Sequence, residues 1–138
     1  MSVRANLITI LLILTSCWAQ DQYCQKSIHT KQAVESVPKG WRADSGKGEH
    51  SLAAITFFDG PPEQEASLVY DSYTKGKRAD LATWKFDRSQ HLWISCIYQG
   101  TEITLAKPLV ENIAEYKVSY SRSIHIDGYQ QIEQITCK

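Results

Sequence analysis

The sequence predicts a mainly β protein: a small antiparallel sheet of meander or sandwich-like type, with an irregular N-terminal segment after a cleaved signal peptide. Three observations predict this class. Short segments rich in β-branched and aromatic residues recur from residue 51 to the C-terminus, and turn residues separate them. No long stretch has the period of an amphipathic helix, so no helical class competes for the chain.

The N-terminal residues have the composition of a secretory leader. Arg4 precedes a largely apolar run over residues 7–14. This run is too short for a transmembrane helix, which needs about 20 apolar residues, but it suits the core of a signal peptide. Cleavage after Ala19 fits the small-residue rule of signal peptidase. Residues 1–19 are therefore expected to be the signal peptide, and residues 20–138 a single secreted β domain.

A second processing signal overlaps the first. Residues 14–17, Leu-Thr-Ser-Cys, resemble a bacterial lipobox, in which Cys17 would be acylated and would anchor the same domain to a membrane. The bulky Trp18 directly after Cys17 is unusual for a lipobox, so simple cleavage is favoured. Either route places the mature chain outside the cytoplasm.

The charges of the chain balance. Fifteen Lys and Arg residues face fifteen Asp and Glu residues, so the overall charge favours neither nucleic acid nor an anionic membrane as a partner. The densest basic stretch, residues 75–78, is expected to be a solvated loop.

Three cysteines follow the leader: Cys24, Cys96 and Cys137. In an oxidising compartment they permit one intramolecular disulfide and leave one thiol over. They form no Cys-x-x-Cys metal or redox motif, and the sequence alone does not fix which two of them pair.

The first half of the mature chain is predicted as follows. Residues 20–50 are polar and rich in glycine, which indicates an irregular segment with Trp41 as its one large apolar anchor. A strand is expected over residues 51–58. The Asp-Gly-Pro-Pro that follows ends it in a tight turn, because glycine permits unusual backbone angles and the prolines cannot donate ladder hydrogen bonds. A short strand is expected at residues 68–70, followed by a polar loop at 74–80.

The segments 82–86 and 91–98 are both strand-like, and the short polar connection Asp-Arg-Ser-Gln between them predicts a hairpin. Residues 91–98 have apolar side chains on both faces: Leu92, Ile94, Cys96 and Tyr98 on one, Trp93 and Ile97 on the other. A strand that is apolar on both faces is typical of the centre of a sheet.

The C-terminal part shows the clearest alternation. A strand over 102–106 ends at Pro108, and residues 110–114 are expected to form a short turn or a single helical turn. Residues 114–121 place Tyr116, Val118 and Tyr120 on one face, which is the period of a half-buried strand. An Asp-Gly turn at 127–128 leads into the closing strand, residues 129–137.

The order of these segments resembles a family of small secreted proteobacterial proteins, mostly uncharacterised. The most specific stretch is a Trp-x-x-Cys-x-Tyr-x-Gly-Thr pattern over residues 93–101, and the similarity extends from Cys24 to Cys137. Some members are periplasmic immunity proteins of type VI secretion effectors that target peptidoglycan and are related to L,D-transpeptidases. The resemblance implies a non-enzymatic, periplasmic inhibitor that binds and occludes a cell-wall-targeting toxin enzyme.

One departure from the family pattern bears on the disulfide. The pattern tends to carry a cysteine where this chain has Tyr116, opposite the C-terminal cysteine of the last hairpin. Without that partner for Cys137, the resemblance implies a disulfide between Cys24 and Cys96. Cys137 is then expected as a free thiol or in a bond between molecules.

No catalytic, metal-binding or cofactor-binding residues are predicted. His29, His50, His91 and His125 have no metal-ligand spacing, and no Gly-x-Ser-x-Gly nucleophile motif is present. Cys96 lies mid-strand, where a cysteine is usually inert packing or half of a disulfide. Glu63 and Glu65 follow a turn, where acidic residues mostly serve solvation.

The residues expected to contact a partner are the rigid turn and three nearby tyrosines: Asp59, Gly60, Pro61, Glu63, Tyr70, Tyr73 and Tyr98. A preorganised turn can enter a partner's cleft at low entropic cost, and tyrosines are common interface anchors. The expected partner is the cognate peptidoglycan-targeting effector. Two alternatives stay open: an envelope binding module or lysozyme inhibitor, and a hydrolase whose site is assembled from distant residues such as His91 and His125.

Overall fold

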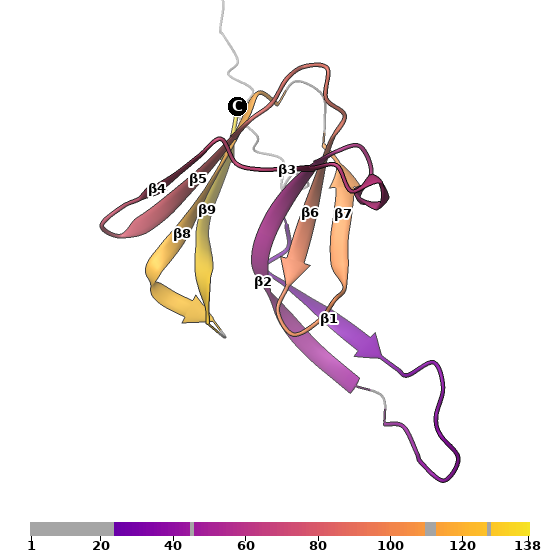
Figure 1. Ribbon diagram of the computed structural model, residues 1–138. Helices are drawn as coiled ribbons and strands as arrows, with labels where there is room; N and C mark the ends of the chain where they lie inside the picture. Colours follow the sequence, from indigo (N-terminus) through magenta and orange to yellow (C-terminus); the bar gives the residue numbers. More distant parts are fainter. Residues whose placement is uncertain (1–23, 45, 110–112, 127) are drawn as a thin grey trace, which may run out of the picture.

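The computed structural model describes residues 24–44, 46–109, 113–126 and 128–138, which form two antiparallel sheets. The first sheet contains β1 (Ser27–Gln32), β2 (Gly46–Asp59), β6 (Leu92–Tyr98) and β7 (Thr104–Pro108) in that order, and β3 (Ser67–Leu68) pairs with β2. The second sheet has the order β4 (Ser72–Lys75), β5 (Ala79–Lys85), β8 (Glu115–Ile126) and β9 (Tyr129–Cys137). Apart from a 3-10 turn at Pro62–Gln64, the described residues contain no helix. The predicted mainly β, sandwich-like class is confirmed (Figure 1).

The core lies between the two sheets. Its centre is Phe57 of β2, which is fully buried. The Phe57 ring lies 5.1 Å from the rings of Trp84 and Phe86 and 4.7 Å from the ring of Tyr116. These tilted and edge-on contacts are the arrangements that aromatic pairs prefer. The remaining core side chains come from both sheets and the segments beside them: Cys24, Ile28, Ile55, Ala82, Leu92, Ile94, Cys96, Tyr98, Leu109, Ile113 and Val118.

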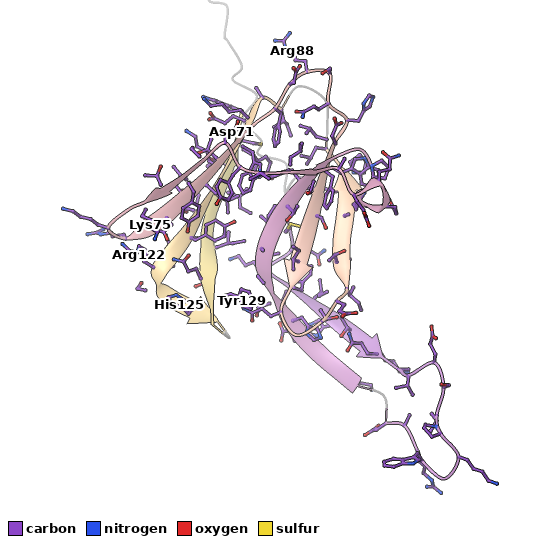
Figure 2. All side chains as sticks on the ribbon, viewed as in Figure 1. Asp71, Lys75, Arg88, Arg122, His125 and Tyr129 are labelled. Carbon is purple, nitrogen blue, oxygen red and sulfur yellow. A yellow bond between two sulfur atoms is a disulfide. The ribbon has the colours of Figure 1, made fainter. Side chains whose placement is uncertain are left out.

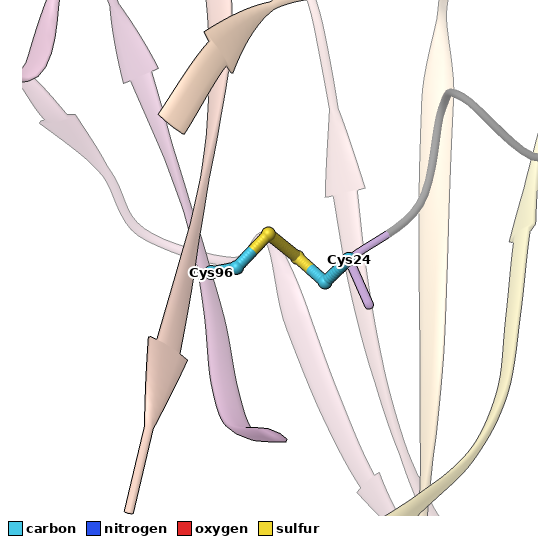
Figure 3. The surroundings of a disulfide bond; sticks show 2 residues. All are labelled: Cys24 and Cys96. Atoms are coloured by element: carbon cyan, nitrogen blue, oxygen red, sulfur yellow. A yellow bond between two sulfur atoms is a disulfide. The ribbon is translucent and has the colours of Figure 1, made fainter. Parts of the chain in front are cut away.

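A disulfide joins Cys24 to Cys96 of β6 (Figure 3). The two residues are 72 positions apart, and the bond lies in the core. The pair that the family resemblance implies is therefore present. The expectation of a free thiol at Cys137 is wrong, because Cys137 is also disulfide-bonded and none of the described cysteines is free.

The N-terminal segment is less irregular than predicted. Residues 27–32 form β1, which pairs with the first residues of β2, and β2 begins at Gly46 rather than near residue 51. Residues 33–44 between them belong to no strand or helix, and every one of them is exposed. The predicted anchor Trp41 is 75% exposed, so it anchors nothing within the described chain.

The predicted hairpin of 82–86 and 91–98 is also wrong. β5 pairs with β4 and β8, whereas β6 pairs with β2 and β7, so the connection between them crosses from one sheet to the other. Residues 74–80, predicted as a loop, are instead a hairpin that joins β4 to β5. The assignment of β6 to the centre of its sheet is confirmed, since it has a partner on each side.

The C-terminal strands agree best with the sequence. β9 covers residues 129–137 as predicted, and β8 extends from Glu115 to Ile126. Tyr116 and Val118 are fully buried. Tyr116 pairs with Cys137 in the ladder, so it lies opposite the C-terminal cysteine of the last hairpin, as expected from the sequence. The strand predicted over residues 102–106 is shifted, because β7 runs over Thr104–Pro108 and includes its proline at the sheet edge. Residues 110–112 of the predicted turn lie outside the described residues.

Candidate partner-binding surface

The predicted turn belongs to a connection, residues 59–71, that runs from the end of β2 to the start of β4 and thus joins the two sheets; we call it the strap. Its first residues have a structural role. The carboxylate of Asp59 accepts a hydrogen bond from the backbone N–H of His91 at 2.9 Å, and the N–H of Gly60 donates to the His91 carbonyl at 2.7 Å. Gly60 is buried and has φ +96°, a conformation that favours glycine. Asp59 and Gly60 therefore hold the strap against the start of β6.

The middle of the strap is the part that faces solvent. Pro61 is partly buried, whereas Glu63 in the short 3-10 turn and Glu65 after it are exposed. The strap contains four acidic residues, counting Asp59 and Asp71 at its ends, and no basic residue. This part of the surface therefore presents negative charge to a partner.

The two tyrosines beside the strap lie together. Tyr70 and Tyr73 are 46% and 38% exposed, and their ring centroids are 5.6 Å apart. The ring of Tyr70 also contacts Trp84 edge-on at 6.0 Å, and the indole N–H of Trp84 donates to the carbonyl of Leu68 at 3.1 Å. These contacts hold the exposed aromatic pair against the core. A shallow cavity of about 380 Å³ adjoins it, with Thr56, Leu68 and Tyr120 among its lining residues.

The buried carboxylate of Asp80 is hydrogen-bonded to Tyr73. Tyr73 Oη donates to Asp80 Oδ2 at 3.0 Å, Gln130 Nε2 donates to the same oxygen at 3.2 Å, and Arg122 lies 3.7 Å from Asp80 Oδ1. Burial alone would raise the pKa of Asp80, but these hydrogen bonds and the charge of Arg122 outweigh it and hold the pKa below its usual value. Burial and the Asp80 hydrogen bond raise the pKa of Tyr73. The network fixes the Tyr73 ring in place.

Tyr98 does not belong to this surface. Its side chain is 2% exposed in the core, where burial raises its pKa. It therefore offers no area to a partner, and we leave it out of the contact set. Of the expected contacts, Glu63, Tyr70 and Tyr73 are the side chains with substantial exposure.

The outer face of the first sheet was not predicted as a contact surface. Paired residues on neighbouring strands share a face, and the side chains opposite the core residues Phe57, Ile94 and Cys96 point outward. The register places nine residues on that face: Ala54, Thr56 and Phe58 of β2; Trp93, Ser95 and Ile97 of β6; Thr104, Ala106 and Pro108 of β7. None is charged, and Phe58 lies directly opposite Trp93.

The outer face of the second sheet is different. There the register aligns Lys85, Glu115, Lys117 and Thr136, and Lys117 forms an ion pair with Glu115 at 3.3 Å. Solvated sheet faces are normally polar in this way. The uncharged outer face of the first sheet is therefore the unusual one, and it begins directly beside the strap, because Phe58 precedes Asp59. The outward alternation of Trp93 and Ile97 was visible in the sequence, although it was interpreted only as a sign of a central strand.

The histidines of the sequence could form two kinds of site, a metal site and a hydrolase site containing His91 and His125. No group of three or more His, Cys, Asp or Glu side chains within them is placed to bind a metal ion. His91 precedes β6 of the first sheet, whereas His125 lies in β8 of the second and is exposed (Figure 2). Within the same described residues, no helix is long and apolar enough to cross a membrane.

A disulfide-linked β-sandwich with a rigid acidic strap, an exposed aromatic pair and an uncharged outer sheet face has the features of a protein-binding module. The comparisons with known proteins agree. The type VI secretion system Tli immunity protein family matches residues 47–138, about two thirds of the chain, and the protein belongs to this family. An uncharacterised 16.3 kDa protein from the trpG 5′ region of Azospirillum brasilense is 26% identical over 145 residues, which cover 96% of each chain. No solved structure matches the chain at a significant level.

Proposed function

We propose that this protein is a periplasmic immunity protein that binds a cell-wall-targeting type VI secretion effector and occludes its active site. The observation that carries the proposal is the family match over residues 47–138, because an immunity protein acts on a cognate effector. The same membership favours a non-enzymatic role. The narrower target, a peptidoglycan-acting enzyme related to L,D-transpeptidases, follows from the sequence resemblance.

The surface proposed for the effector is the strap together with the outer face of the first sheet. Glu63, Tyr70 and Tyr73 supply charge and exposed aromatic area at the strap. Phe58 and Trp93, both partly buried, supply apolar area on the outer face, where Phe58 directly precedes the strap. Aromatic residues in a region without charge, bordered by a polar rim, are the usual composition of a protein interface. The hydrogen bond from Tyr73 to Asp80 and the contact of Tyr70 with Trp84 keep the two tyrosines ordered before binding, which lowers the entropic cost of association.

The location is part of the proposal. Residues 1–19 act as a signal peptide that is cleaved after Ala19, and the alternative is a lipid anchor at Cys17. The disulfide between Cys24 and Cys96 supports an oxidising compartment such as the periplasm, because structural disulfides are rare in the cytosol. Both routes deliver the same domain to the same compartment.

The first experiment is affinity capture of the protein, expressed with its leader, from its native bacterium grown with its secretion systems active. Intact mass is read on everything that elutes. The proposal expects a one-to-one companion with a peptidoglycan hydrolase or transpeptidase domain, and it expects the purified protein to inhibit that enzyme on peptidoglycan fragments. The mass of the bait also reports cleavage after Ala19 or lipidation of Cys17.

Paired variants locate the surface on the captured enzyme. Tyr70→Ala with Glu63→Lys is expected to weaken inhibition, whereas Ile124→Ala, which removes a 50% exposed apolar side chain from β8, is expected to leave it unchanged. A protein that elutes alone, or that binds the enzyme without inhibiting it, would contradict occlusion. Inhibition of host lysozymes instead would assign the chain to the class of envelope inhibitors.

A further inference from the structure

The connection between β1 and β2, residues 33–44, projects away from both sheets; we call it the arm (Figure 1). All of its residues are exposed, and three of them are large apolar side chains. Val34, Val37 and Trp41 are 60%, 44% and 75% exposed. Single exposed apolar residues are common, but a tryptophan on a projecting loop with two valines nearby is a concentration of apolar area that nothing in the described chain covers.

The tip of the arm is ordered by local bonds rather than by packing. The N–H of Trp41 donates to the carbonyl of Pro38 at 3.0 Å, and Gly40 has φ +86°. A positive φ at the third residue and this hydrogen bond define a type II turn, in which glycine is favoured. A β-carbon at Gly40 would meet nothing within 4 Å, so the backbone conformation, not space, requires the glycine. The turn therefore fixes the backbone at Trp41 and places its side chain at the exposed tip of the arm.

The tip of the arm and the strap carry opposite charges at the two ends of β2, whereas the arm as a whole is neutral, because Glu35 and Asp44 balance Lys39 and Arg42. At the tip of the arm, Lys39 and Arg42 flank the Gly40–Trp41 pair, and residues 37–42 include no acidic side chain. The strap is acidic, with no basic side chain. Opposite charges at the two ends of one surface fix the orientation of a partner and exclude partners with the wrong pattern.

The size of an ordinary domain permits contact at both ends. β2 has 14 residues, and at about 3.3 Å per residue it separates the arm from the strap by roughly 45 Å. A globular domain of about 200 residues has a radius of gyration near 16 Å and is therefore roughly 40 Å across. One effector domain seated on the outer face of the first sheet can thus approach the arm as well as the strap.

The arm precedes the region that the family model matches. That match begins at Lys47 and includes the strap and the outer face of the first sheet. The relative from Azospirillum brasilense aligns over the arm as well, at 26% identity over the whole alignment. An exposed tryptophan outside the region that the family model matches is suited to distinguish one effector from another.

We propose that the arm is a second, specificity-determining contact with the cognate effector, and that Trp41 docks into an apolar recess bordered by carboxylates that pair with Lys39 and Arg42. The inference rests on the proposed function. Tryptophan and arginine are the residues most often found at interface hot spots. The strap and sheet face then supply the binding that family members share, and the arm supplies the discrimination.

The test uses the full mature protein and the effector recovered by affinity capture, with binding measured by calorimetry. Trp41→Ala is expected to raise the Kd about 10- to 100-fold, the range for truncating a hot-spot residue. Lys39→Glu with Arg42→Glu is expected to weaken binding and to reduce its salt dependence. The unfolding midpoint of each variant should stay at the wild-type value, because every residue of the arm is exposed. Ile124→Ala serves as the matched exposed-residue control.

A photocrosslinking side chain placed at position 41 should join the effector, and mass spectrometry should map the joined peptide to a recess with acidic residues. A Kd for Trp41→Ala within twofold of wild type, in a complex that Tyr70→Ala weakens, would overturn the arm contact and leave the proposed function intact. Absence of any complex with the wild-type protein would overturn both. Binding of the wild type, but not Trp41→Ala, to phosphatidylglycerol vesicles with an unchanged effector Kd would overturn the inference and assign the arm to a membrane surface.

Discussion

Removal of the Cys24–Cys96 disulfide should cost a large share of the stability of the domain. The bond closes a loop between residues 72 positions apart. In the chain-entropy treatment, closing such a loop lowers the entropy of the unfolded chain and raises its free energy by about 4 kcal/mol at 25 °C. Domains of this size are stable by roughly 5–15 kcal/mol in total. Cys24→Ala with Cys96→Ala is therefore expected to lower the free energy of unfolding by about 4 kcal/mol.

The assay is equilibrium unfolding in urea, followed by tryptophan fluorescence under oxidising conditions. With an m value of about 2 kcal/mol/M, the midpoint should fall by roughly 2 M. Reduction is the control, and it must be applied to both proteins because a thiol reductant also breaks the disulfide of Cys137. Under reducing conditions the wild type and the variant should agree to within about 1 kcal/mol. A difference below about 1 kcal/mol under oxidising conditions would refute the reasoning and would show that the bond does not form or does not restrict the unfolded state.

Two further predictions concern the core and the buried carboxylate. Phe57→Ala should lower the free energy of unfolding, measured in urea, by about 3–5 kcal/mol, because it empties the centre of the aromatic cluster. Phe58→Ala, which changes the outward-facing neighbour, should lower it far less. Equal losses would contradict the assignment of Phe57 and Phe58 to opposite faces of β2. The pKa of Asp80 lies below its unfolded value near 3.9, so Asp80 contributes stability above about pH 4 that is lost as the pH falls through the folded pKa. The unfolding free energy of Asp80→Asn should consequently fall less than that of the wild type between pH 5 and pH 3 in a series of urea titrations, and parallel curves would contradict the network.

The elements that sequence analysis predicted well are those whose signal is local. Strand β8 has a period-2 alternation over residues 116–120, and the turn that leads into β9 contains Gly128, which has φ +86° in the structure. Burial of Tyr116 and Val118 follows from the same alternation. These features depend on neighbours along the chain, so the sequence contains them.

Strand pairing was not predictable in the same way. The connection between β5 and β6 has the length of a hairpin, yet each of the two strands pairs with other strands. The inner faces of β5 and β6 cover the core from opposite sides, so the two strands lie in different sheets. β1 is mostly polar and has one buried apolar side chain, Ile28, so its pairing with β2 comes from the tertiary structure rather than from its own pattern. Local length and composition do not encode such long-range choices.

The candidate surface shows the same division. The sequence indicated the rigid turn and the exposed pair Tyr70 and Tyr73, but it could not show that Tyr98 is buried or that Trp41 is exposed. Residue type gives the tendency of a side chain to be buried, whereas its neighbours decide the outcome. The uncharged outer face became visible only when the register aligned Phe58 with Trp93.

The central claim is that this protein neutralises a type VI effector by binding it. The most direct measurement is the growth of a test bacterium that exports the captured effector to its periplasm, with and without this protein exported to the same compartment. Growth should be restored when the protein is present in at least equal amount, and Tyr70→Ala with Glu63→Lys should restore it less. Growth arrest that persists with the wild-type protein in molar excess in the periplasm would contradict the account.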